Sequence, residues 1–195
     1  MIVDGLLRPG QKIAQESIAL ELGVSRVPVR EALIQMERDG LVVSRANVGA
    51  FVAPFDESVI RDHFEVVGRV QGLAAGRTAS VKDRALLEHL AQIRDTLARE
   101  RDPLAANSLA VEFQRLVNRG CGSNRLRSVL RSLSRILPMD IFVHIPGSVP
   151  AQQEAIGAMY TAISTRRRID ETFVGVAHTR ADLIVADLRR RGTFP

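Results

Sequence analysis

The segment 23–33, GVSRVPVREAL, constrains the fold of this chain more than any other part of the sequence. Gly23 can adopt a positive φ and end one helix, and Ser25 is a favourable N-cap for the next. Pro28 falls in the first turn of that helix, where a missing backbone N–H costs little. The segment therefore predicts a tight turn that leads directly into a helix.

This helix has two faces of opposite character. Val29, Leu33 and Met36 recur at helical spacing and predict an apolar face that packs inward. Arg26 and Arg30 lie one turn apart on another face and are free to point outward. Exposed arginines are most often a solvated surface, but a guanidinium can also bond guanine O6 and N7 together, with roughly 1–3 kcal/mol of discrimination. The helix is therefore a candidate for reading DNA bases.

A second, shorter helix is expected immediately upstream. Residues 15–22, QESIALEL, form an amphipathic pattern with Ile18, Ala19 and Leu22 on the inward face. Two short helices joined by a turn that contains glycine are typical of a helix-turn-helix, in which the second helix reads bases and the first braces it on the backbone.

The residues that follow predict a β-hairpin. Two β-prone runs, 41–45 and 50–53, flank a segment that contains asparagine and glycine. A hairpin directly after a helix-turn-helix is a wing. Its tip residues Arg45, Asn47 and Gly49 could approach phosphates or the minor groove.

Residues 2–53 resemble the winged-helix domain of the GntR family of bacterial transcription regulators. The run 24–33, Val-Ser-Arg-x-Pro-Val-Arg-Glu-Ala-Leu, is the most specific part of this resemblance. In the family, the arginines that match Arg26 and Arg30 are the main DNA contacts, and a wing glycine that matches Gly49 lets the backbone lie close to the duplex. The other matching residues are Gly5, Leu7, Pro9, Gly10, Leu22, Gly23, Gly40, Leu41, Val42 and Val52.

The resemblance implies a DNA-binding surface, from which the sequence departs in two places. The family's first helix largely precedes the turn that matches Pro9-Gly10, so most of that helix is expected to be absent here. Glu16 stands where some relatives place an arginine that contacts phosphate or a base, which could weaken binding or shift its specificity. The expected DNA-contacting residues are Ser25, Arg26, Val27, Pro28 and Arg30 in the helix and Arg45, Asn47 and Gly49 in the wing.

Composition restricts the class of protein. The 195 residues, 46% of them hydrophobic and 25% charged, are typical of a soluble protein of one or two domains. No apolar run approaches the ~20 residues of a membrane span, no signal peptide opens the chain, and Cys121 is the single cysteine. These features fit a protein of the reducing cytoplasm that has no membrane partner. Residues 1–55 hold six basic and six acidic side chains, so DNA affinity must depend on their placement.

Beyond Pro54 the strand signals end and helical periodicity begins. Six helices joined by short loops predict an antiparallel all-α bundle around one core. The expected organisation is therefore mainly α, with a winged helix-turn-helix domain over 1–54 and a helical domain over 55–195. The six predicted helices span 56–80, 82–100, 103–119, 123–138, 149–166 and 168–191.

The helical part, residues 58–190, resembles the FCD (FadR C-terminal) ligand-binding domain. The resemblance depends on Phe113, the turn 122–126, the pair 162–163 and His178. Many such domains hold a divalent metal with one aspartate and three histidines, and the metal helps to bind a small carboxylate effector. The resemblance therefore implies a small-molecule pocket inside the helical bundle.

The metal ligands of that family do not carry over to this sequence. Ala110 takes the place of the aspartate, Gln114 and Ile156 those of two histidines, and only His178 is as expected. Alanine and isoleucine cannot bind a metal, and an amide is a poor ligand for a transition metal. No metal or other cofactor is expected. The pocket could persist without the ion, with Gln114 and His178 as polar groups on a wall that includes Ala110 and Ile156, or side chains could fill it.

The sequence shows no sign of catalysis. It lacks a G-x-G-x-x-G motif, a P-loop and a G-x-S-x-G motif, and its four histidines have no ligand spacing. The function expected from the resemblance is a nucleoid-associated transcription regulator that binds a near-palindromic DNA operator as a homodimer. A small carboxylate-like effector would modulate that binding. The alternative is a ligand-binding or interaction module whose truncated winged helix no longer binds DNA.

Overall fold

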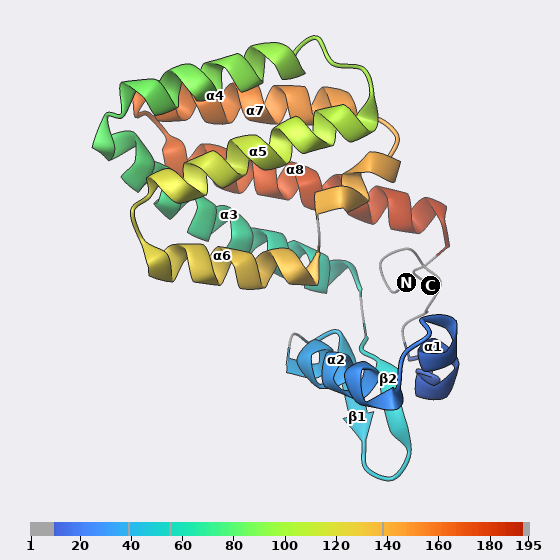
Figure 1. Ribbon diagram of the computed structural model, residues 1–195. Helices are drawn as coiled ribbons and strands as arrows, with labels where there is room; N and C mark the ends of the chain where they lie inside the picture. Colours follow the sequence, from blue (N-terminus) through green and yellow to red (C-terminus); the bar gives the residue numbers. More distant parts are fainter. Residues whose placement is uncertain (1–9, 39, 55, 138, 193–195) are drawn as a thin grey trace. The chain divides into compact units, whose positions relative to one another are not determined.

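The computed structural model describes residues 10–38, 40–54, 56–137 and 139–192. The chain divides into two compact units, of which the first runs to Glu57 and the second comprises Ser58–Arg190. In its described residues, the first unit contains two helices and a hairpin, and the second is helical (Figure 1). This arrangement confirms the predicted fold class, which is mainly α with a winged helix-turn-helix followed by a helical domain.

The first unit has the element order of a winged helix-turn-helix. Gly23 has a φ of +65°, as the turn between the two helices requires. The expectation of a missing first helix concerns residues 1–9, which lie outside the described residues. The elements are α1 (Gln15–Glu21), α2 (Arg26–Arg38), β1 (Val42–Arg45) and β2 (Gly49–Val52).

A small apolar core joins α1, α2 and the hairpin. Val29 and Leu33 are buried on the inner face of α2, as predicted, and Ala19 is buried in α1. The expectation that Leu22 and Met36 face inward is wrong, because they are 64% and 38% exposed. Leu22 follows the last turn of the short α1, and Met36 lies beyond the last α2 residue that contributes to this core.

The second unit contains the six predicted helices and one shorter element. Each helix begins and ends within a few residues of its predicted bounds, and the additional 3-10 helix falls between the predicted helices 123–138 and 149–166. The elements are α3 (Glu57–Val81), α4 (Arg84–Leu97), α5 (Pro103–Gly120), α6 (Asn124–Ile136), η1 (Met139–His144), α7 (Ser148–Thr165) and α8 (Ile169–Arg190).

Side-chain caps fix where three of these helices begin. The Asp83 carboxylate accepts a hydrogen bond from the backbone N–H of Leu86 at 3.0 Å, which caps α4. The Asp102 carboxylate caps α5 through the N–H of Ala105 at 2.8 Å, and Pro103 occupies the first helical position. The Ser123 hydroxyl caps α6 in the same way. Each cap accepts a hydrogen bond from a backbone N–H group that has no acceptor within the helix itself.

Helix α5 lies at the centre of the helical unit and contacts α4, α6, α7 and η1 (Figure 1). Its Phe113 is completely buried and packs in the main core with Met159 of α7 and Phe173 of α8. Helix α3 approaches α8 closely at Gly68. A Cβ built there would lie 2.8 Å from the Cβ of Ala177, so only a residue without a side chain fits.

The partly buried His63 of α3 gives the protein a testable pH dependence. Burial lowers the pKa of His63 below its usual 6.5, so the unfolded chain binds more protons than the folded chain. This contribution to stability is complete above pH 6.5 and is lost as the pH falls below it. We expect the free energy of unfolding of the His63→Gln variant to fall less steeply between pH 7 and pH 5 than that of the parent chain. Urea unfolding measures this, with the exposed His89→Gln as the control; equal slopes for all three proteins would contradict it.

Candidate nucleic-acid interface and effector pocket

The first turn of α2 presents most of the predicted DNA-contacting residues to solvent. The helix begins at Arg26, directly after Ser25, and both residues are exposed. Pro28 and Arg30 are exposed as well, and Val27 is 64% exposed although it is apolar. Because Val29 and Leu33 turn the opposite face inward, the structure brings these five residues together on one open surface.

Arg26 forms an ion pair with a residue of the preceding helix. Its Nη1 lies 2.7 Å from Oε1 of Glu16 in α1, and the two side chains are 73% and 74% exposed. Surface pairs of this kind contribute about 0–1 kcal/mol, so a phosphate or a base can displace the carboxylate at little cost. Arg30, in contrast, forms no ion pair within the part of the chain that the structure describes.

The Glu16 carboxylate should therefore oppose DNA binding. We expect Glu16→Gln to bind DNA several-fold more tightly, because the change frees Arg26 and removes a negative charge that would face the phosphates. Fluorescence anisotropy with a labelled duplex measures the effect. Glu21→Gln, which removes an exposed charge at the end of the same helix, is the matched control. Weaker binding by Glu16→Gln would show that the carboxylate supports the interface instead.

The hairpin forms the predicted wing, with Val42 paired to Val52 and Arg45 paired to Gly49. Asn47 has a φ of 59° and Gly49 a φ of 121°, so both turn residues adopt conformations that asparagine and glycine tolerate best. The guanidinium of Arg45 stacks over the ring of Phe51 at 4.5 Å from its centroid, which fixes the position of this charge.

Two contacts connect the wing to the rest of its unit. Ser44 of β1 donates from its N–H and from its hydroxyl to the carboxylate of Glu37 in α2, at 3.0 and 2.9 Å. Lys12 pairs with Phe51 through the backbone. The Cε atom of its side chain would lie only 3.2 Å from a Cβ built at Gly49, so the lysine packs closely against this glycine. The sequence did not reveal Lys12 as a wing residue, because the pairing of its segment with β2 has no local signature.

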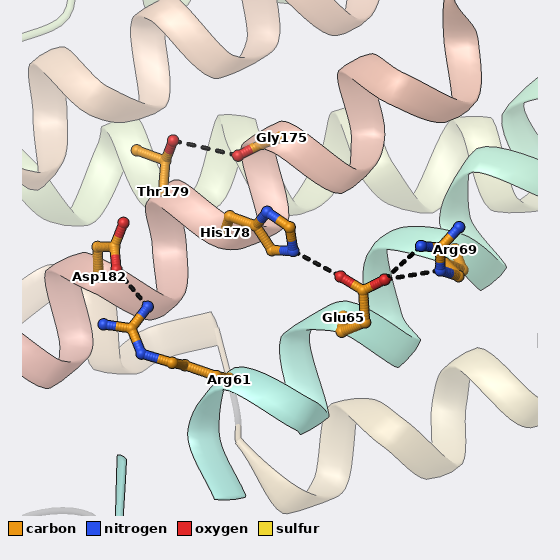
Figure 2. Close-up of polar contacts among 7 residues, drawn as sticks. All are labelled: Arg61, Glu65, Arg69, Gly175, His178, Thr179 and Asp182. Carbon is orange, nitrogen blue, oxygen red and sulfur yellow. Dashed lines mark hydrogen bonds and ion pairs between the residues drawn. The ribbon is translucent and has the colours of Figure 1, made fainter. Parts of the chain in front are cut away.

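The predicted pocket residues do not come together around one cavity. Ala110 and Ile156 are completely buried in the bundle, and Gln114 is 7% exposed. His178 faces another side, where its side chain is 52% exposed. Its Nε2 lies 2.5 Å from Oε2 of Glu65 in α3 (Figure 2).

His178 belongs instead to a row of polar contacts between α3 and α8 (Figure 2). Glu65 also pairs with Arg69 at 2.6 Å, and Arg61 pairs with Asp182 of α8 at 2.6 Å. The hydrogen bond to His178, followed by that to Arg69, lowers the pKa of the Glu65 carboxyl. Among the described residues, no group of three or more His, Cys, Asp and Glu side chains is placed to hold a metal ion.

A cavity of about 280 Å³ lies elsewhere, between η1, α7 and α8. Two buried polar side chains line it, Gln152 at 3% exposure and Arg180 at 5%. Burial lowers the pKa of Arg180 to about 10, so the guanidinium remains charged at neutral pH. The sequence contained a signal for Arg180, because it follows Phe173 and Ala177 at the spacing of the buried face of α8.

Comparison with known proteins places this arrangement among transcription regulators. A family model described as bacterial regulatory proteins of the gntR family matches residues 1–52. An uncharacterised HTH-type transcriptional regulator of Mycobacterium tuberculosis strain H37Rv is 30% identical over 195 residues, which cover 98% of this chain and 79% of the relative. The Nta operon transcriptional regulator of Aminobacter aminovorans is 31% identical over 97 residues, which cover 50% of this chain and 45% of that protein.

Solved structures show the same fold over nearly the whole chain. A GntR family transcriptional regulator from Pseudomonas syringae pv. tomato has a TM-score of 0.58 at 21% identity, covering 98% of this chain and 84% of that one. Escherichia coli McbR/YncC has a TM-score of 0.65 at 16% identity, covering 97% and 92%. In the described part of the chain, no helix is both long and apolar enough to cross a membrane. The match to the mycobacterial regulator over 98% of this chain and the match of residues 1–52 to the family model establish that this chain belongs to the gntR family of bacterial regulatory proteins.

Proposed function

We propose that the protein is a transcription regulator that binds a near-palindromic DNA operator as a homodimer and acts by binding, not by catalysis. The observation that carries this proposal is the exposed pair Arg26 and Arg30 at the start of the second helix of a winged helix-turn-helix. We propose that it acts on the nucleoid in the bacterial cytoplasm, because that is where a regulator of this family meets its DNA.

The DNA contacts divide between α2 and the wing. The first turn of α2 would enter the major groove, where guanidinium groups can read guanine. The wing would lie along the adjacent backbone or minor groove, and Lys12 adds a charge there that can contact a phosphate. The contacts that we propose are Ser25, Arg26, Val27, Pro28 and Arg30 in the major groove, and Lys12, Arg45, Asn47 and Gly49 at the wing.

A homodimer follows from the way in which one winged helix reads DNA. A single α2 covers one half-site, and a two-fold partner is needed to read the second half of a palindrome. An apolar stripe on α3 supports this proposal. Val59, Val66 and Leu73 recur every seven residues and are 39%, 48% and 49% exposed, as expected of a face that a second copy covers.

The helical unit would supply regulation. We propose that it is an FCD-type domain that binds a small carboxylate-like effector without a metal or another cofactor. A ligand that prefers one geometry of the dimer would change the spacing of the two α2 helices and so the affinity for DNA.

Binding to DNA from upstream of the protein's own gene tests the proposal directly. We expect a complex of two chains per duplex, with an affinity that falls steeply as salt rises and that exceeds the affinity for a scrambled duplex. Fluorescence anisotropy and sedimentation velocity measure affinity and stoichiometry. Equal affinity for both duplexes would favour the second candidate function, a ligand-binding or interaction module whose winged helix does not recognise DNA.

A further inference from the structure

Arg180 of α8 is a buried cation that has no counter-charge in the described part of the chain. It is 5% exposed, and no carboxylate pairs with it among the described residues. With the amide of Gln114 in α5 assigned so that its oxygen faces the guanidinium, this oxygen accepts hydrogen bonds from Nη1 and, at 3.1 Å, from Nη2. An amide carries no net charge, so the positive charge of the buried guanidinium is not neutralised, and binding an anion beside it would be favourable.

A second buried group faces the same cavity without a partner. Gln152 of α7 is 3% exposed, and in the described structure neither its amide nitrogen nor its oxygen forms a hydrogen bond. Buried amides without partners are rare in native proteins because each unmet group costs about 1–3 kcal/mol. Gln152 and Arg180 both line the cavity, so one ligand could satisfy both groups.

The rest of the cavity limits the size and charge of this ligand. The cavity is bounded mainly by apolar side chains such as Phe142, Val176 and Leu183, and its volume of about 280 Å³ suits a small molecule. Glu154 and Glu171 also line it and are exposed. Glu171 pairs with Arg168 at 2.6 Å, so Glu154 is the carboxylate that would repel a second negative charge near the solvent side. One buried cation, apolar walls and this exposed carboxylate favour a ligand with a single anionic group and an apolar body.

We propose that the cavity between η1, α7 and α8 binds a small monocarboxylate. Its carboxylate would form a two-point contact with the Arg180 guanidinium and accept a hydrogen bond from Nε2 of Gln152, while its apolar part would fill the space beside Phe142 and Leu183. Gln114 holds the guanidinium in position from behind. The proposal rests on the effector part of the function proposed above and assigns the carboxylate contact to Arg180.

Calorimetric titration of the full chain with a panel of carboxylates tests this site. The panel contains short-chain and aromatic monocarboxylates, the neutral amide of each, matched dicarboxylates, and amino acids. We expect at least one monocarboxylate to bind and its amide to bind about tenfold to hundredfold more weakly, since the amide cannot meet the charge of Arg180. Stronger binding of a dicarboxylate or an amino acid would overturn the single-charge assignment, and no binding by any carboxylate would overturn the site.

Two variants locate the binding. Arg180→Met should lower the affinity for the monocarboxylate by about tenfold to hundredfold. Arg77→Met, which removes an exposed arginine of α3, should leave this affinity unchanged. Should Arg180→Met fail to fold, Gln152→Leu provides the test. This change removes no hydrogen bond of the protein, so it should leave the midpoint of thermal unfolding unchanged and lower the affinity for the ligand several-fold. Unchanged binding by Gln152→Leu would overturn the proposal. Because DNA is absent from these titrations, their failure leaves the DNA-binding function standing.

Discussion

Replacing Arg30 with alanine is expected to weaken binding to the specific operator by about 1–3 kcal/mol per half-site, or roughly 5- to 150-fold. The side chain is exposed at the start of α2 and forms no ion pair with the rest of the described chain, so its full contact with DNA is lost. Arg26→Ala should cost less, because Arg26 must first leave Glu16 before it reaches the duplex. Fluorescence anisotropy with operator and scrambled duplexes measures both effects.

Arg38→Ala provides the matched control for these two variants. Arg38 is also an exposed arginine of α2, but it lies in the last turn, far along the helix from Arg26. It should change specific binding little, and any effect should be the same for both duplexes. If Arg30→Ala and the parent chain bound the operator with equal affinity, this face of α2 would not be part of the DNA interface. A loss that is equal for operator and scrambled DNA would assign Arg30 to phosphate contact instead of base reading.

Adding a single methyl group at Gly68 is expected to destabilise the helical unit by about 1–3 kcal/mol. The new Cβ would lie 2.8 Å from the Cβ of Ala177 and 2.9 Å from the Cα of Val174, and the backbone of α8 cannot yield as a flexible side chain would. Alanine otherwise favours a helix over glycine by roughly 0.5–1 kcal/mol, so the steric effect must exceed that gain. Urea unfolding, followed by circular dichroism, gives the change in free energy.

Gly76→Ala separates the steric effect from helix propensity. Gly76 lies on the same helix, and a Cβ there would meet nothing within 4 Å. This variant should be as stable as the parent chain or more stable by roughly 0.5–1 kcal/mol. If Gly68→Ala stabilised the protein by the same amount, α3 and α8 could not lie as close together as the structure places them.

The sequence predicted those parts of the fold that depend on local chemistry. The glycine turn at Gly23 and the asparagine in the wing each specify a local backbone conformation. The same local signals identified the exposed face of α2. Hydrophobic periodicity sufficed to place the six long helices, because five of them contribute buried residues to the main core and α6 contributes Leu130 to a smaller one.

The predictions that failed required knowledge of contacts distant in sequence. Periodicity assigned Met36 to the core, but how far the core extends along α2 depends on the packing of the hairpin. The family pattern assigned a pocket role to His178, whereas the structure turns His178 towards Glu65 on α3 and directs Arg180 into the cavity. The two residues are two positions apart on α8, which places them about 200° apart around the helix axis and therefore on nearly opposite faces.

Selection of bound sequences from a random DNA library tests the central claim most directly, namely that Arg26 and Arg30 of α2 read base edges. The parent chain should enrich an inverted repeat, and alanine at either arginine should remove the preference at one position in each half while the remaining positions persist. Enrichment of no sequence by the parent chain, or of the same sequence by the parent and both variants, would contradict the account.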